Sequence, residues 1–313
     1  MPLTTRPSLF PVVVSSTYCQ DGGAELVAAD AREERKLLIV IGQVLVDPWL
    51  GITRTGQFPT WLKDTSVLGI PVRHSHGWRS NVLVRSMDRA HEWLRWHGRG
   101  RSLVPRIDSW LGNYWLDRVP KVQVGFFTSP DTVAWQQRLV DVYALQRWKV
   151  MGSLTQALTE DFTHVYFTTA SSYIRVHKLL AVVNELPLTR VYAGTPFTDA
   201  ISGTHFASGA NRILSRDVVE SVVAAKGRYR NDVMEDAGLG RLVHELGIDL
   251  MPLPSVNVPS VRAVRELSDE EILDTFHFRT TSLSSRQRMD AQVMQTLHSR
   301  VVELEVDQGI RRV

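Results

Sequence analysis

The 313-residue sequence contains a single cysteine, Cys19. It therefore cannot form an intramolecular disulfide or a cysteine-based zinc site, and this composition is typical of a reducing compartment. Long apolar runs are also missing: the run 37–41 has five residues before Gly42, whereas a membrane-spanning helix needs about 20. Pro11 interrupts the apolar stretch near the N-terminus, so that stretch does not read as a signal peptide. We therefore expect a cytoplasmic protein with no transmembrane anchor.

Several motifs of common enzyme classes are absent as well. The sequence has no GxSxG nucleophile elbow, no GxxxxGKS/T phosphate loop and no strand-linked GxGxxG. The pairs His74–His76 and His91–His97 lack a carboxylate cluster, so we expect no metal site at either pair. A hydrophobic content of 43% and a charged content of 22% exclude global disorder. The chain is thus long and apolar enough for a large core.

Short β-branched segments alternate with stretches of helical periodicity. A long helix is predicted over 131–161, and shorter helices are predicted after Ser215, a candidate N-cap, and over 235–246. Strands are predicted at 37–46, 67–75, 121–129, 163–171 and 188–194. This alternation indicates an α/β fold with a largely parallel sheet.

The chain is expected to have three parts. These are an irregular or helical N-terminal segment (1–36), a main domain (37–265) and a helical extension (266–313). Within the extension, Ser268 and Glu271 have the spacing of a capping box. Apolar residues then recur at near-helical spacing: Met289, Val293, Leu297 and Val301. The extension either packs on the domain or mediates self-association, and the oligomeric state stays open.

A basic, tryptophan-rich segment covers 79–118. Residues 79–106 contain seven arginines and two acidic residues, with Trp93 and Trp96 among them. A solvated helix with tryptophans packed beneath it explains this composition. A groove for a phosphorylated or ring-shaped acceptor also explains it, because arginine pairs with phosphate and aromatic faces stack on sugars or bases. The net charge of +3 argues against general nucleic-acid binding.

Four segments taken in order carry a family resemblance over about 210 residues. The first (37–62) reads as a strand and an arginine-containing helix that ends in Thr-Trp, and the second (141–149) keeps Asp-x-Tyr followed by Lys149. The third (164–180) has the shape of a strand and turn, and the fourth (191–248) contains Ser-x-Asp and Glu-Asp-x-x-x-Gly. Together they resemble the fringe and β-1,3-galactosyltransferase family.

The resemblance implies a GT-A-like fold, a nucleotide-sugar-binding α/β sandwich. It implies an inverting glycosyltransferase that moves a hexose from a nucleotide sugar, a UDP-sugar, to an acceptor hydroxyl. By carry-over, Asp236 is the base and Glu235 orients the acceptor. A carboxylate at a helix N-terminus is also favoured in its ionised form by the helix dipole, although acidic residues there are common simply as caps.

The third segment departs from the family pattern. Where the family has consecutive aspartates that hold a divalent metal, this chain has Thr169-Ala170-Ser171. Neutral hydroxyls are poor ligands for Mg²⁺ or Mn²⁺, so we expect no tightly bound metal. Cationic side chains must then stabilise the departing diphosphate.

The remaining predicted site residues divide between donor and acceptor. On the donor side we expect Arg54, Lys149, Thr169, Ser171 and His277, with Arg279 as a further candidate cation. Lys149 on a solvated helix face and His277 as a buried core histidine are the alternative interpretations. On the acceptor side we expect Ser208, Gly209, Trp93 and Trp96. The run around Gly209 fits either a close backbone approach to a ligand or a turn.

Two other functions remain open. The fold could carry a non-catalytic carbohydrate- or partner-binding protein that has lost the acidic motif. The basic segment could instead serve a glycosyltransferase that acts on modified bases in DNA, which would bind DNA with strong salt dependence. A carbohydrate or glycolipid acceptor is the more ordinary alternative.

Overall fold

The computed structural model describes residues 34–44, 48–78, 86, 90, 133–140, 146–198, 203–229, 234–281 and 288–309. Within 133–140, Trp135 is the residue whose side chain is described. The chain divides into two compact units, 1–34 and 35–313, and the described helices and strands belong to the second. Among these helices, none is both long enough and apolar enough to cross a membrane. The basic segment 79–118, with Trp93 and Trp96, lies outside the described residues apart from Ser86 and Ala90.

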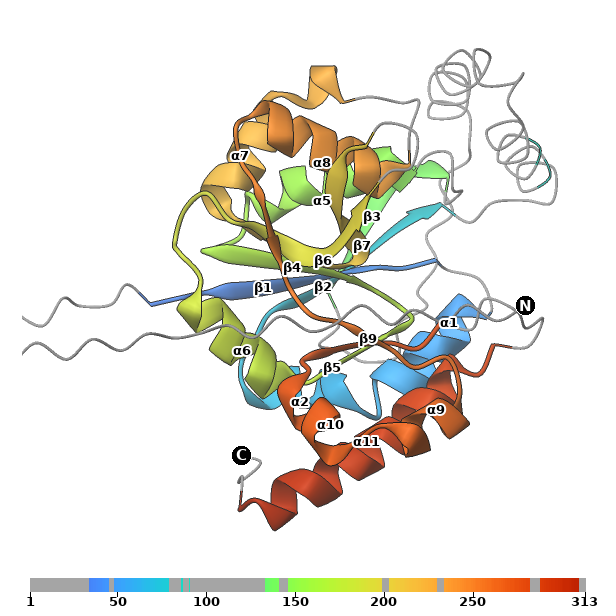
Figure 1. The fold of residues 1–313 in the computed structure, drawn as a ribbon. Helices are drawn as coiled ribbons and strands as arrows, with labels where there is room; N and C mark the ends of the chain where they lie inside the picture. The colour runs from blue at the N-terminus through green and yellow to red at the C-terminus, as the bar shows by residue number, and fades with distance from the viewer. Residues whose placement is uncertain are drawn as a thin grey trace, which may run out of the picture. The chain divides into compact units, whose positions relative to one another are not determined.

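Seven of the described strands form the central sheet of the second unit (Figure 1). In spatial order they are β3 (Val133–Val140), β2 (Val72–Trp78), β1 (Leu37–Gly42), β4 (His164–Thr169), β7 (His205–Ser215), β6 (Tyr192–Thr198) and β8 (Leu250–Pro252). β7 runs antiparallel to both neighbours, and the other pairs of described strands in this sheet are parallel. The predicted α/β fold with a mostly parallel central sheet is confirmed.

The first strand shows why the sheet is covered on both faces. In β1, Leu37, Ile39 and Ile41 belong to one buried apolar cluster, whereas Leu38 and Val40 belong to another. Successive side chains of a strand point to opposite faces, so a continuous apolar run indicates a strand buried from both sides. The sheet therefore separates two cores, each closed by its own layer of helices.

The two helical layers are visible above and below the sheet in Figure 1. The upper layer consists of α5 (Gln146–Ala157), α7 (Arg216–Ala224) and α8 (Glu235–Glu245). The lower layer includes α2 (Trp61–Val67), α6 (Val176–Glu185) and α11 (Asp290–Asp307). Leu154 of α5 and Leu239 of α8 are fully buried with one cluster, and Leu179 of α6 and Leu297 of α11 are fully buried with the other. The helical extension thus shares a core with β1.

A small second sheet joins the end of β4 to the C-terminal region. It consists of β5 (Ser172–Ile174), β10 (His277–Arg279) and β9 (Val256–Asn257), with β10 in the middle. Arg279 of β10 pairs in register with Ser172 of β5. The shorter elements are α1 (Trp49–Ile52), the π-helical η1 (Thr53–Gln57), η4 (Lys226–Arg228), α9 (Val261–Glu266) and α10 (Asp269–Asp274). The predicted capping box of Ser268 and Glu271 is present at the start of α10.

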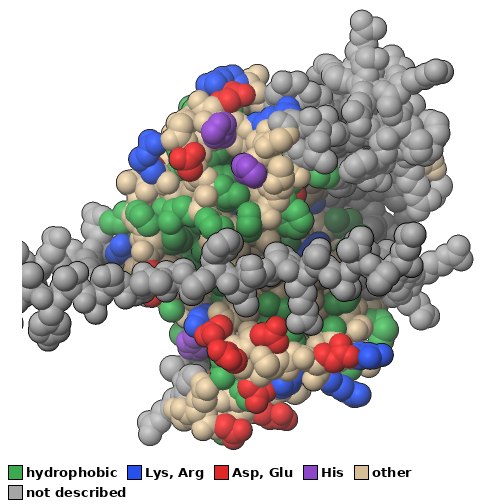
Figure 2. Space-filling view, viewed as in Figure 1, with side chains coloured by type: hydrophobic (Ala, Val, Ile, Leu, Met, Phe, Trp, Pro, Cys, Tyr) green, Lys and Arg blue, Asp and Glu red, His purple; other side chains and the backbone are tan. Residues whose placement is uncertain are grey.

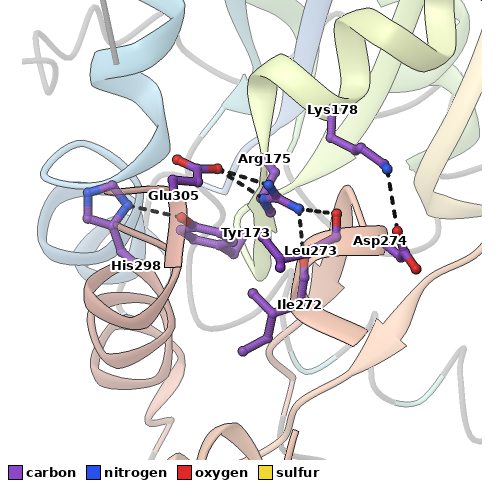
Figure 3. Close-up of polar contacts among 8 residues, drawn as sticks. All are labelled: Tyr173, Arg175, Lys178, Ile272, Leu273, Asp274, His298 and Glu305. Atoms are coloured by element: carbon purple, nitrogen blue, oxygen red, sulfur yellow. Dashed lines mark hydrogen bonds and ion pairs between the residues drawn. The ribbon is translucent and has the colours of Figure 1, made fainter. Parts of the chain in front are cut away.

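Buried polar contacts fix α11 against the rest of the unit (Figure 3). The guanidinium of Arg175 donates to Glu305 Oε1 of α11 and to the carbonyl oxygens of Ile272 and Leu273 in α10. The Arg175 and Glu305 side chains are only 7% and 6% exposed. This pair therefore connects the start of α6 to both C-terminal helices. Figure 2 shows that the outer surface of this layer gathers acidic side chains.

Two predicted elements have boundaries that differ from the structure. The predicted helix over 131–161 is wrong at its start, because residues 133–140 form β3 and the helix begins at Gln146. A short apolar run does not distinguish a strand from a buried helix by periodicity alone. A strand was predicted over 67–75, but β2 begins five residues later, at Val72. The strand predicted over 121–129 lies outside the described residues.

Gly69 explains the late start of β2. It has a φ of +65°, and its N–H donates to the carbonyl of Ser66 while the N–H of Ile70 donates to that of Thr65. These two bonds form a Schellman motif, which ends α2 on a left-handed glycine. At the start of α7, Ser215 occupies the N-cap position as predicted, but its hydroxyl donates to Asp217 Oδ1 instead of capping the helix.

Candidate active site

A cavity of about 340 Å³ lies at the carboxyl ends of β1 and β4. Gly42 and Thr169, the last residues of these strands, pair in register and both line it. Ligands in open α/β sheets commonly bind outside the carboxyl ends of the strands. The predicted site residues that line the cavity are Lys149, Thr169, Ser171, Ser208, Gly209, Glu235 and Asp236, and the candidate cation Arg279 lines it too.

The acidic pair opens α8 at the edge of the cavity. Glu235 and Asp236 lie in the first turn of this helix, where the unpaired backbone N–H groups and the dipole favour negative charge. Asp236 Oδ2 accepts the N–H of Gly209 at 3.4 Å, and its Oδ1 accepts the N–H of Ala237 at 3.0 Å. Asp236 is half-buried and remains accessible from the cavity.

Gly209 permits the close approach of the acidic pair to β7. A Cβ atom at this position would lie 3.3 Å from Glu235 Oε2 and 3.9 Å from Asp236 Cβ. The residue lies within β7, so the interpretation of this run as a turn is wrong. An added Cβ would crowd Glu235 Oε2 and would reach ordinary van der Waals contact with Asp236, so the glycine leaves room for the acidic pair.

A buried arginine holds Glu235 from behind. Arg212 of β7 is 1% exposed, and its Nη1 lies 2.8 Å from Glu235 Oε1. The Tyr229 hydroxyl donates to the backbone carbonyl of Glu235 at 2.6 Å. Burial raises the pKa of the Glu235 carboxyl above its ordinary value, while Arg212 acts to lower it. Glu235 is therefore engaged within the protein, and Asp236 is the more available of the two carboxylates.

Lys149 provides positive charge in the same cavity. It lies in the first half of α5 and is 2% exposed, and its Nζ donates to the carbonyl oxygen of Gln43 at 3.0 Å. Gln43 directly follows β1, and its side-chain Oε1 accepts the hydroxyl of Thr53 at 2.7 Å. The interpretation of Lys149 as a solvated surface lysine is thus wrong. Its ammonium group is held at the carboxyl end of β1.

Hydrogen bonds from three other segments hold the Thr169–Ser171 turn in place. Gln57 Nε2 donates to the carbonyl of Thr169 at 3.0 Å, and Trp61 Nε1 donates to that of Ser172 at 3.1 Å. The carbonyl of Ser171 accepts both the N–H and the hydroxyl of Thr280. These contacts fix the hydroxyls of Thr169 and Ser171 at the cavity wall.

Two arginines donate hydrogen bonds to the side-chain hydroxyls of this turn. Arg279 Nη1 of β10 donates to Thr169 Oγ1. Arg288 Nη2 donates to Ser171 Oγ at 2.7 Å, and its guanidinium lies 4.3 Å from the centre of the Trp49 ring. The Arg288 side chain is 15% exposed and pairs with the fully buried Asp290. Arg279 is the cation that the sequence suggested, and Arg288 was missed.

Two predicted donor residues do not line the cavity. His277 is 1% exposed and hydrogen-bonds Ser255 through Nδ1 and Ser172 through Nε2. Burial, together with the charge of Arg279, lowers the pKa of His277 to about 3, so it is neutral and offers no positive charge to a diphosphate. Arg54 is exposed on η1 and is not among the cavity-lining residues.

Sequence reasoning also missed three residues in or next to the cavity. Arg212 and Tyr229 anchor Glu235, and Trp49 lines the cavity beside Arg288. In the sequence, Arg212 lies within an apolar strand, which was the available signal: a charge in a buried strand needs a partner. Among the described residues, no group of three or more His, Cys, Asp or Glu is placed to hold a metal.

Comparisons with known proteins give a limited result. No model of a protein family matches the sequence, and no curated protein matches it. Among solved structures, a similar chain is the crystal structure of a glycosyltransferase involved in the glycosylation of the major capsid of PBCV-1. The sequences are 9% identical with a TM-score of 0.39, and the match covers 86% of this chain and 99% of that one. Similarity at this level does not assign the chain to a family.

Proposed function

We propose that this protein is an inverting glycosyltransferase that transfers a sugar from a nucleotide sugar to an acceptor hydroxyl. The observation that carries the proposal is the pairing of opposite charges within one cavity at the carboxyl ends of β1 and β4. An available carboxylate, Asp236, lines this cavity together with two cations, Lys149 and Arg279. Seven of the predicted site residues come from distant parts of the chain and line this cavity.

Inverting sugar transfer needs two kinds of group, a base for the acceptor and cations for the leaving group. In a single displacement, the acceptor oxygen forms a bond to the anomeric carbon while the bond from that carbon to the diphosphate oxygen breaks. Asp236 accepts the acceptor's hydroxyl proton, and the nucleoside diphosphate leaves with the electron pair. Lys149 and Arg279 stabilise the negative charge that develops on the leaving group.

Each residue around Asp236 has a positioning role in this scheme. The Gly209 N–H and the Ala237 N–H orient the Asp236 carboxylate. Arg212 anchors Glu235, which in turn places the first turn of α8 beside β7. Glu235 Oε2 is directed toward Gly209 and can orient the acceptor. We propose a UDP-sugar as donor and a carbohydrate or glycolipid as acceptor, following the family resemblance.

The proposal is tested by turnover of nucleotide sugars. The purified full-length chain is incubated with a panel of UDP-, GDP- and ADP-sugars, and release of the nucleoside diphosphate is measured with and without simple sugar acceptors. Release from one donor, enhanced by an acceptor and with inversion at the anomeric carbon shown by NMR, is the expected result. Tight binding of a nucleotide sugar or a glycan without any release would instead support the non-catalytic alternative.

A further inference from the structure

The Thr169–Ser171 turn has chemistry that suits an anion and not a divalent cation. Each of its two hydroxyls accepts a hydrogen bond from a guanidinium group, Arg279 on Thr169 and Arg288 on Ser171. A divalent metal bound at these oxygens would lie beside two like charges with neutral ligands around it. Mg²⁺ and Mn²⁺ prefer carboxylate oxygens, so the residues present do not fit such a metal.

The local charges leave an excess of positive charge. Asp290 is paired with Arg288 through both of its carboxylate oxygens, at 2.8 Å each. Arg279 is bonded to a neutral hydroxyl. Burial and the neighbouring charge of Arg288 lower the pKa of Arg279 to about 10, which leaves it protonated at neutral pH. A buried cation in this setting is stabilised when an anion arrives beside it.

We infer that Arg279, supported by Arg288, is the subsite for the donor's diphosphate and takes the place of a carboxylate-bound metal. Arg279 lines the cavity and contacts the anion directly. Arg288 acts from behind Ser171 and Trp49, which both line the cavity, and is a positioning residue that also adds positive charge. Guanidinium groups suit this role because their planar donors match phosphate oxygens. The inference rests on the proposed function for the identity of the anion.

The test measures binding of inorganic pyrophosphate and UDP by calorimetry, in EDTA and in Mn²⁺. The wild-type chain should bind both ligands in EDTA, and Mn²⁺ should not tighten binding. Arg279→Gln removes a charged hydrogen-bond donor to the anion, so it should weaken pyrophosphate binding by about 10- to 100-fold. Arg279→Lys keeps the charge and should recover part of the affinity, and Arg288→Gln should give a smaller loss.

A matched control is Arg262→Gln, which removes a surface arginine whose side chain is 88% exposed and should leave binding unchanged. Binding of pyrophosphate only in Mn²⁺, or equal binding by wild type and Arg279→Gln, would overturn the inference. If Arg279→Gln does not fold, the inference is still tested in two ways. These are wild-type pyrophosphate binding in EDTA against Mn²⁺, and the affinity of Arg279→Lys. Metal-free pyrophosphate binding without any sugar transfer would refute the proposed function alone. Sugar transfer that requires Mn²⁺ would refute the inference alone.

Discussion

The ion pair between Arg212 and Glu235 offers a strict test of how the candidate site is supported. The Arg212 side chain is 1% exposed, Glu235 is 11% exposed, and their charged atoms lie 2.8 Å apart. Arg212→Met keeps most of the apolar stem but leaves the Glu235 carboxylate buried without its cation. Breaking a buried pair in this way typically costs about 3–5 kcal/mol of unfolding free energy.

The same variant should show a characteristic pH dependence. Burial already raises the pKa of Glu235, and removing Arg212, which acts to lower it, should raise it further. The folded variant then retains a proton that the unfolded chain releases above its ordinary carboxyl pKa. Its stability relative to wild type should therefore fall as the pH rises from 5 to 8.

Urea unfolding of four proteins measures this effect: wild type, Arg212→Met, Glu235→Leu and the double variant. The double variant should lose less stability than the sum of the single variants, because neither charge is then left alone. Arg262→Met, which breaks an exposed pair, serves as the control and should unfold like wild type. The reasoning is refuted if Arg212→Met unfolds within about 1 kcal/mol of wild type at both pH values, as an exposed pair would.

Three further predictions concern β7, the C-terminal helices and the buried histidines. Gly209→Val should fold, because valine suits a strand. It should reduce sugar transfer by about 100-fold, because the new side chain displaces the acidic pair. The control is Gly227→Ala, where an added Cβ meets open space. Arg175→Met should lower the unfolding free energy by about 3–5 kcal/mol, since it breaks a buried ion pair with Glu305, and an unchanged urea midpoint would show that α11 docks without this pair. The free energy of unfolding should fall as the pH drops from 7 to 4. Folding lowers the pKa of His277 to about 3 and that of His74 to about 4, so the unfolded chain binds protons at a higher pH than the folded protein does. His277→Gln should flatten this pH slope, and an equally steep slope would show that His277 is not the source.

The fold was predictable where local pattern and burial agree. The apolar run of β1 has to be buried on both faces, and its neighbours follow from the alternation of strands and helices. A predicted element boundary was wrong where a single residue determines where the helix ends. Gly69 ends α2 in a left-handed conformation and delays β2, which hydrophobic periodicity does not reveal.

The candidate site also contains residues that the sequence pointed to and residues that it did not. The resemblance pointed to Asp236, Lys149 and Thr169, which line one cavity, while their roles stay predictions. It did not point to Arg288, because the role of this residue depends on the packing of Trp49 and on the contact with Ser171, more than 100 residues away. His277 was misassigned because its burial behind Ser172 depends on how β10 pairs with β5.

The most direct test of the account is sugar transfer by Asp236→Asn. The substitution removes the carboxylate that accepts the proton and keeps the size of the side chain. Asp269→Asn is the matched control, because Asp269 also lies in the first turn of a helix but is exposed and does not line the cavity. The account predicts that Asp236→Asn binds the nucleotide sugar like wild type and loses transfer by at least about 100-fold, while Asp269→Asn keeps it. Full transfer by Asp236→Asn would contradict the central claim.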